Sequence, residues 1–233
     1  MEQADQSFFE KPGVADTYEQ GPRWFIPGYD ASHAMAAVLL RDRLGEHAEI
    51  LVFGAGGGVE LGLLAQECRG WRFLGVDPSA AMLARAEAKI AAIGAQDRVT
   101  LMRGYAENMP QKTFDAATAF LVLPFIPDDG RRLAAMQAIA ARLMPGAPFL
   151  MINACADMKA PSFEGDLRRY AAFARRSGAP SEMVEGAVAM QRITMSFVTA
   201  EREEALLAQA GFENAKVFYR ALMMQGWIAN RKG

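Results

Sequence analysis

The stretch Ile50-Leu51-Val52-Phe53-Gly54-Ala55-Gly56-Gly57-Gly58-Val59-Glu60-Leu61-Gly62 decides the fold of this chain. Its apolar first part is typical of a buried parallel strand, and the glycines let the backbone turn sharply and approach a ligand without a Cβ in the way. The residues after the glycines begin a helix. A strand, a glycine turn and a helix in this order predict a nucleotide-binding unit, with a plain glycine turn as the alternative.

A second strand, residues 71–77, ends in the carboxylate of Asp77. Doubly wound folds place an acidic residue about twenty positions after such a glycine turn, where it accepts hydrogen bonds from a ribose. A carboxylate suits this role because it only accepts hydrogen bonds. The alternative is that Asp77 caps the helix that begins near Ser79, although Ser79 is itself a good cap.

Strand and helix patterns alternate along the rest of the chain, which is typical of parallel βαβ units. Residues 156–192 are charged and helical in pattern without a strand, so we expect them to form an insertion over the sheet. The expected strands are 49–53, 71–77, 98–102, 114–121, 149–154, 216–219 and 222–229. The expected helices are 30–44 with Asp30 as its cap, 59–68, 80–93, 128–144 and 200–210.

Length and composition narrow the class of protein. The 233 residues, 52% of them hydrophobic, are enough for one α/β core and too few for two, so we expect a single domain over 1–233. A net charge of −2 provides no field that attracts nucleic acid or an anionic membrane. The polar start, the absence of a membrane-spanning run and the distant Cys68 and Cys155 lead us to expect a cytoplasmic protein.

The two histidines, His33 and His47, are not spaced with acidic residues or cysteines as metal ligands are, so we expect no metal. His33 follows Tyr29 in the predicted helix and is a candidate general base, because imidazole titrates near neutral pH. A structural role is the alternative for this histidine. The sequence also lacks the Gly-Lys-Ser/Thr run of a phosphate-binding loop and a Ser, His and Asp arrangement, which disfavours kinases and hydrolases.

Several motifs resemble, in order, those of the class I S-adenosylmethionine-dependent methyltransferases, over roughly residues 48–230. They are Gly54-x-Gly56-x-Gly58, Asp77, Gly104-Tyr105-Ala106-Glu107, Phe114-Asp115 through Phe120-Leu121-Val122-Leu123, Leu143-Met144-Pro145-Gly146, and Gly211-Phe212 before the paired terminal strands. The resemblance implies an α/β, Rossmann-like fold. Its seven-stranded, mostly parallel sheet would end in a reversed C-terminal β-hairpin, with an N-terminal helical cap (1–45) and the helical insert (156–192). A nicotinamide dehydrogenase is disfavoured because Val59 stands where its third glycine would be.

The same resemblance implies S-adenosyl-L-methionine as the cofactor. The residues that would bind it are Gly54, Ala55, Gly56, Gly58, Asp77, Pro78, Met82, Tyr105, Ala106, Glu107, Phe120 and Leu121. The residues that would line the substrate site are Tyr18, Trp24, Tyr29, Phe125 and Arg192. Tyr18, Trp24 and Tyr29 would lie near the cationic sulfur and Phe125 would pack against the adenine or the substrate, with simple packing in the core or a lid as the alternative. Tyr29 and His33 are the candidate catalytic groups.

A closer resemblance is to the carboxy-S-adenosylmethionine synthases and bacterial methyltransferases built like them. It rests on the segments 23–29 and 76–82 and on the layout of insert, Ala210-Gly211-Phe212 and terminal hairpin. In that family a tyrosine after Pro-Gly and an arginine of the insert help to hold a carboxylated cofactor, and Tyr29 and Arg192 would imitate them. This chain departs from the pattern: glycines replace a Cys-Ser-containing turn at 54–58, and Phe120 replaces an asparagine.

Three functions are compatible with these observations. The first is a methyltransferase that acts on a small-molecule acceptor. The second is a synthase-like enzyme that carboxylates the cofactor for tRNA modification. The third is a non-catalytic cofactor-binding protein, since Pro124-Phe125 after the fourth motif offers no polar catalytic group. The sequence leaves open the acceptor atom and the oligomeric state, a homodimer included.

Overall fold

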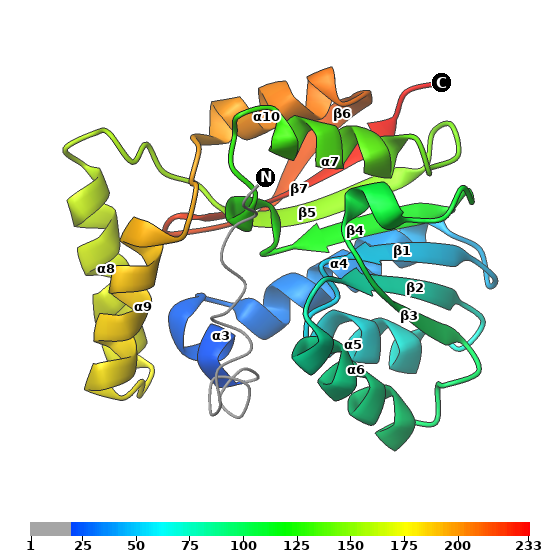
Figure 1. Ribbon diagram of the computed structural model, residues 1–233, viewed down its shortest axis with the longest axis horizontal. Helices are drawn as coiled ribbons and strands as arrows, with labels where there is room; N and C mark the ends of the chain where they lie inside the picture. The colour runs from blue at the N-terminus through cyan, green and yellow to red at the C-terminus, as the bar shows by residue number, and fades with distance from the viewer. Residues whose placement is uncertain (1–19) are drawn as a thin grey trace.

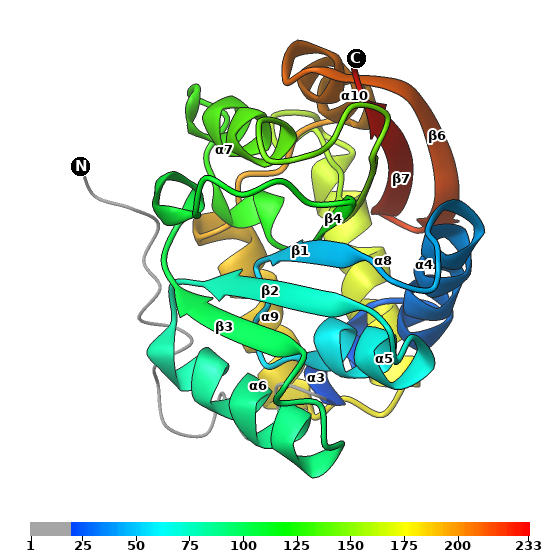
Figure 2. The same cartoon turned by 90° about the vertical axis from the view of Figure 1, so that its right-hand side faces the viewer.

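The computed structural model describes residues 20–233, in which helices cover both faces of one seven-stranded sheet (Figures 1 and 2). The strands are β1 (Glu49–Phe53), β2 (Arg72–Asp77), β3 (Val99–Arg103), β4 (Ala116–Phe120), β5 (Pro148–Ala154), β6 (Phe212–Ala221) and β7 (Met224–Arg231). The helices are α3 (Gln20–Phe25), α4 (Tyr29–Arg43), α5 (Val59–Glu67), α6 (Ala80–Ala92), α7 (Arg131–Ala140), α8 (Phe163–Arg176), α9 (Ser181–Ile193) and α10 (Ala200–Gln209), with short 3₁₀ turns η1 (Ala106–Asn108) and η2 (Leu123–Phe125).

The strands lie in the order β3-β2-β1-β4-β5-β7-β6. The first five are parallel to one another, whereas β7 runs antiparallel to β5 and β6 runs antiparallel to β7. The central strands β4 and β5 are buried along their whole length, as expected for parallel strands covered on both faces. The predicted Rossmann-like, mostly parallel sheet with a reversed C-terminal hairpin is confirmed.

Alternating side chains of β1 divide the hydrophobic core into two layers. Ile50 and Val52 belong to the layer with Leu40 of α4 and Leu61 of α5, whereas Leu51 belongs to the opposite layer with α7 and α10. Figure 1 shows α4, α5 and α6 on one side of the sheet and α7 and α10 on the other. The sheet therefore has no face exposed along β1.

The helical cap and the helical insert meet at one end of the sheet. There, α3 packs against α8, and the Phe25 and Tyr170 rings stack with centroids 5.0 Å apart. The α8 and α9 helices lie side by side and stand with α3 beyond the end of the sheet at which the parallel strands end (Figures 1 and 2). The predicted insert is thus a pair of helices placed over the carboxyl ends of the strands.

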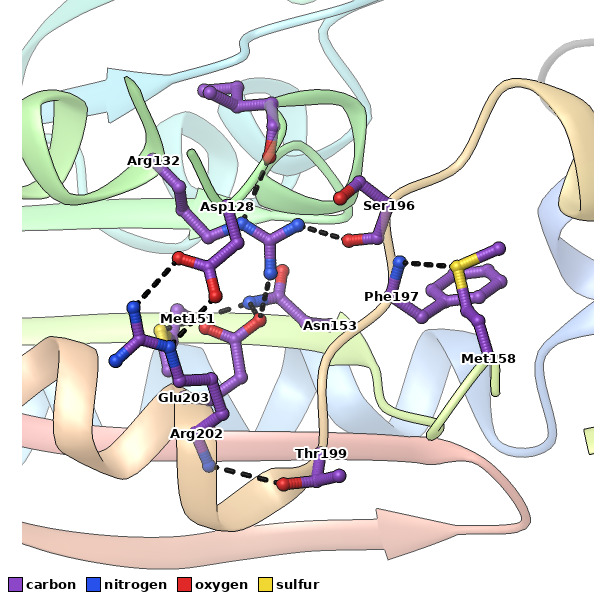
Figure 3. Close-up of polar contacts among 11 residues, drawn as sticks. Asp128, Arg132, Met151, Asn153, Met158, Ser196, Phe197, Thr199, Arg202 and Glu203 are labelled. Carbon is purple, nitrogen blue, oxygen red and sulfur yellow. Dashed lines mark hydrogen bonds and ion pairs between the residues drawn. The ribbon is translucent and has the colours of Figure 1, made fainter. Parts of the chain in front are cut away.

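A buried ion pair joins segments that are far apart in sequence (Figure 3). The Arg132 side chain of α7 has no exposed surface, and its Nη1 donates to Glu203 Oε1 of α10 at 3.0 Å. The same guanidinium donates from Nε to the Ile126 carbonyl at 3.0 Å and from Nη2 to the Ser196 carbonyl. The Asn153 amide of β5 donates to the same Glu203 oxygen at 3.2 Å. One side chain therefore links the loop after β4, the segment after α9, and α10.

Two predicted helix boundaries are wrong because glycines rather than polar side chains precede these helices. Gly28, with φ 70°, precedes α4, and Asp30 lies within its first turn, paired with Arg23. Gly130, with φ 103°, precedes α7, which covers ten residues instead of the expected 128–144. A left-handed residue cannot continue a right-handed helix, so neither helix extends further toward the N-terminus.

Two predicted strand boundaries also differ from the structure. The fourth strand is shorter than 114–121, because Leu121 leaves it with φ 60°. The hairpin strand β6 is longer than the predicted 216–219, and β7 is shifted by two residues, because Leu222, expected in the last strand, lies in the turn with φ 52°. The error in β6 has a cause in the sequence pattern: five consecutive residues of this strand are exposed, so they show no alternation of apolar and polar side chains.

We expect Arg132→Met to lower the free energy of unfolding by about 3–5 kcal/mol near pH 8, because it leaves the Glu203 carboxylate buried without its cation. Burial already raises the pKa of Glu203 to about 7. A raised folded-state pKa means that the folded protein binds more protons than the unfolded chain, so stability falls as pH rises. Urea unfolding should therefore show a smaller loss at pH 5.5.

The matched control is Arg131→Met, which removes the exposed partner of Asp129 and should leave the urea midpoint nearly unchanged. Arg132→Met combined with Glu203→Leu should recover most of the lost stability, because no charge then remains buried. A loss in Arg132→Met that is the same at pH 5.5 and pH 8 would contradict this account.

Candidate functional site

The candidate site lies where the strand order reverses, between β1 and β4. From β1 the chain continues to β2 and β3 on one side, and from β4 it continues to β5 on the other. Loops leave such a switch point in opposite directions, and ligands of open α/β sheets bind there, outside the carboxyl ends of the strands. The segments that leave this edge are the glycine turn after β1 and Leu121 after β4.

The glycine turn is shaped by packing as well as by backbone conformation. Gly54, Gly56 and Gly58 have φ angles of 77°, 50° and 76°, which side chains rarely permit. A Cβ on Gly54 would lie 2.6 Å from the Val122 side chain, and a Cβ on Gly58 would lie 2.8 Å from the Cα of Ala86. The turn therefore packs against the loop after β4 on one side and against α6 on the other.

Asp77, at the end of β2, is bonded directly to the glycine turn. Its Oδ2 accepts the Gly56 N–H at 2.8 Å, and its Oδ1 accepts the Ser79 N–H at 2.9 Å. Burial raises the pKa of Asp77, and these two hydrogen bonds oppose the rise. Each oxygen keeps a second lone pair for a ligand. Ser79 caps α6, since its hydroxyl accepts the Met82 N–H at 3.3 Å, so the capping alternative for Asp77 is not needed.

The loop after β3 joins the same edge. The Gly104 N–H donates to the Asp77 carbonyl at 3.1 Å, and the Tyr105 N–H donates to Asn108 Oδ1 at 2.9 Å. Ala106 is buried and Glu107 is exposed. The structure thus brings the predicted cofactor residues at the ends of the first four strands to one edge of the sheet, and Met82 is a buried residue in the first turn of α6.

Tyr29 and His33, the candidate catalytic residues, are both buried on α4 and lie next to the end of β4. Their ring centroids are 4.4 Å apart, and the His33 ring meets the Phe120 ring edge-on at 5.3 Å. His33 Nδ1 lies 2.9 Å from the Tyr29 carbonyl, which only accepts, so Nδ1 carries the proton and Nε2 the lone pair. Burial lowers the pKa of His33, so the imidazole is neutral at pH 7 and its Nε2 can accept a proton.

Other predicted substrate residues are less closely grouped. Arg192 is on an exposed face of the insert, where its Nη2 lies 2.7 Å from Oε2 of Glu164. Trp24 is half-buried against the core on the cap side, and Phe125 is half-buried in η2. Tyr18 lies outside the described residues. The ion pair with Glu164 holds Arg192 within the insert itself, and the role of Arg192 toward a cofactor stays a prediction.

The sequence reasoning missed one residue of this edge, Glu60, and the backbone strain of Leu121, which it did predict to bind the cofactor. Leu121 holds φ 60° while its N–H donates to the Ile152 carbonyl at 2.7 Å, a strained conformation of the kind that gathers at functional sites. Glu60, in the first turn of α5, is a carboxylic acid with 7% of its surface exposed. The available signal is a single acid in the otherwise apolar run Val59-Glu60-Leu61, which by its pattern fits an ordinary helix.

Comparison with known proteins agrees with this architecture. Residues 50–146 match the family model described as "Methyltransferase domain". A carboxy-S-adenosyl-L-methionine synthase of Methylococcus capsulatus is 26% identical, with 96% of this chain and 95% of that protein covered. An O-methyltransferase family protein of Burkholderia thailandensis superposes with a TM-score of 0.69 at 14% identity, over 99% of this chain and 63% of that one.

Human N-acetylserotonin methyltransferase, solved in complex with S-adenosylmethionine, superposes with a TM-score of 0.65 at 15% identity over 100% of this chain. At this identity the likeness shows the fold, and the chain spans 60% of the length of the human protein. The fold and the site define a class I methyltransferase architecture. Residues 50–146 therefore match a methyltransferase domain, and the architecture of the chain is that of the class I S-adenosylmethionine-dependent methyltransferases.

Within residues 20–233, no helix is both long and apolar enough to cross a bilayer. In the same part of the chain, no three or more His, Cys, Asp or Glu side chains gather as metal ligands do.

We expect Gly58→Ala to destabilise the protein more than Gly94→Ala does. Both glycines have positive φ, 76° and 65°, so both variants carry the conformational cost of about 1–2 kcal/mol. Only the Gly58 Cβ meets a neighbour, the backbone of Ala86, which should add about 1–3 kcal/mol of overpacking. Urea unfolding of the two variants measures the difference. Equal losses of stability would show that the start of α5 can move away from Ala86 of α6 at no cost.

Proposed function

We propose that this protein binds S-adenosyl-L-methionine along the carboxyl edge of β1 to β4 and transfers its methyl group to a small-molecule acceptor. One observation carries the proposal: the Asp77 carboxylate accepts the Gly56 N–H. An acid at the end of β2 and a glycine turn at the end of β1 are thereby held together at the switch point of the sheet. This is the arrangement that a nucleoside with a ribose diol and a chain beyond it requires.

The chemistry of the edge residues fits the parts of this cofactor. The segment 105–107 would frame the adenine, and Asp77 would accept hydrogen bonds from the ribose hydroxyls through its remaining lone pairs. The turn at 54–58 has no side chain larger than the methyl group of Ala55 and would leave the methionine part room. When bound, the cofactor supplies an electrophilic methyl group on a positively charged sulfur.

The protein's own contribution would be alignment, exclusion of water and removal of a proton. The α3, α8 and α9 helices gather beyond the carboxyl ends of the strands, and an acceptor would have to fit beneath them (Figure 1). Such a cover favours a small molecule over a macromolecule. For an acceptor that must lose a proton, His33 Nε2 and the buried Tyr29 are the groups that we propose for the role.

A second candidate function is favoured by one finding, the carboxy-S-adenosyl-L-methionine synthase that matches 96% of this chain. Its chemistry would modify the cofactor instead of an acceptor. The exposed ion pair of Arg192 with Glu164 and the position of Phe120 at the end of β4 do not favour that reading. A cofactor-binding protein without catalysis is the third candidate, since the η2 turn after β4 carries only apolar side chains.

We expect Asp77→Ala to weaken S-adenosyl-L-methionine binding by about 1–3 kcal/mol in calorimetry, because charge-assisted hydrogen bonds to the ribose are lost. Asp77→Asn, which keeps one acceptor oxygen, should fall between this variant and the wild type. Asp97→Ala is the matched control, since Asp97 is exposed just before β3, at the opposite edge of the sheet. Unchanged affinity in folded Asp77→Ala would remove Asp77 from the site.

We also expect native mass spectrometry of the freshly purified protein to release S-adenosyl-L-methionine or its demethylated product. A released cofactor heavier by one carboxyl group would support the synthase reading, and Tyr29→Phe and Arg192→Ala should then lose the carboxylated form selectively. A protein that is empty and also ignores added cofactor would support the non-catalytic candidate.

A further inference from the structure

Glu60 is a buried acid beside the glycine turn that no part of the proposed chemistry uses. It is the second residue of α5, two positions after Gly58, and 7% of its surface is exposed. Burying a carboxyl group is costly unless the group is neutral or paired with a cation. The position of Glu60 therefore requires an explanation.

One carboxyl oxygen of Glu60, Oε1, has no hydrogen-bond partner in the part of the chain that the structure describes. The same is true of the Thr118 hydroxyl of β4, and both atoms are fully buried. Burial raises the pKa of Glu60 to about 8, and the nearby Thr118 hydroxyl opposes part of the rise. The acid is thus mostly protonated at pH 7 and holds an unused acceptor oxygen beside an unused hydroxyl.

The order of the strands indicates which part of a ligand this acid faces. The adenine loop follows β3, the ribose acid ends β2, and the glycine turn ends β1, so the proposed sites follow one another along the edge. Thr118, which lies beside Glu60, is on β4, the next strand in this order, and pairs in register with Val52 of β1. The part of the cofactor beyond the ribose, its methionine end, would reach this position.

We propose that Glu60 binds the cationic methionine end of the cofactor through the α-ammonium group and releases its proton to solvent when the cofactor binds. The inference rests on the proposed function. The Glu60 O–H bond breaks, the carboxylate keeps the electron pair, and the ammonium keeps all of its protons. A positive charge next to the acid stabilises its ionised form, and the start of α5 adds the favourable end of the helix dipole.

The coupling predicts how affinity depends on pH. Below the pKa of Glu60 in the free protein, a proton must leave on binding, so affinity should rise about tenfold per pH unit between pH 6 and 7. The elements packed against α5 carry other ionisable groups, namely His33 of α4, Asp77 of β2 and Lys89 of α6. Thr118 is the one polar residue of β4 and is uncharged. Because His33 and Asp77 titrate in their own right, only the difference between wild type and a Glu60 variant reports the coupling.

The test is calorimetric titration of wild type and Glu60→Gln with S-adenosyl-L-methionine at pH 6, 6.5 and 7, in phosphate and in Bis-Tris. Two buffers with different ionisation enthalpies give the number of protons released. Wild type should release close to one proton more than Glu60→Gln. The variant should bind roughly ten- to a hundredfold more weakly at pH 7, without the tenfold rise per pH unit.

Two controls keep the outcome specific. Methylthioadenosine, which lacks the amino-acid end, should bind wild type and Glu60→Gln equally, which shows that the variant's nucleoside site is folded. Glu67→Gln, at the exposed far end of α5, should behave as wild type with both ligands. Equal affinity or equal proton release in wild type and Glu60→Gln overturns the inference and leaves the proposed function intact. A wild type that binds neither ligand refutes the proposed function itself.

Discussion

The guanidinium of Arg132 is the constraint on which the arrangement around the candidate site depends. It has no exposed surface, so each of its donors must find an acceptor inside the protein. The acceptors are Glu203 and the carbonyls of Ile126 and Ser196, from three separate segments (Figure 3). The loop after β4 and the segment that follows the insert are thereby fixed to α7 and α10. A hydrophobic contact would not specify these positions as narrowly, because it lacks direction.

A second constraint is steric and acts on the other side of the switch point. The turn after β1 must pass close to Val122 and Ala86, and only glycine at positions 54 and 58 leaves room for both neighbours. The same closeness brings the Gly56 N–H to the Asp77 carboxylate. Packing and site geometry therefore have one cause here. The turn is an unobstructed edge for a ligand because the protein itself already required the absence of side chains.

The order of strands and helices was predictable because local signals agreed: apolar runs, glycine stops and a Ser79 cap. The boundaries at Gly28 and Gly130 were not, since a glycine in left-handed conformation replaces a polar cap there. Of the site, the glycine turn and Asp77 followed from spacing. Arg132 with Glu203, 71 residues apart, and Glu60 beside Thr118 did not, because contacts between distant charged or polar residues have no period in the sequence.

Asp77 and Glu60 show how two acids on neighbouring elements acquire different properties. Both are buried, and burial raises the pKa of each. Asp77 receives two backbone N–H groups that stabilise its charge, whereas Glu60 has only the Thr118 hydroxyl nearby. The hydroxyl donors of a ribose would stabilise the charged form of Asp77 in the same way as these two N–H groups. A neutral Glu60 suits a cation, because the cation makes ionisation favourable only while it is present. The same edge of the sheet would thus recognise the ribose through an acid whose charge the backbone stabilises, and the methionine end through an acid that ionises only when a cation is bound.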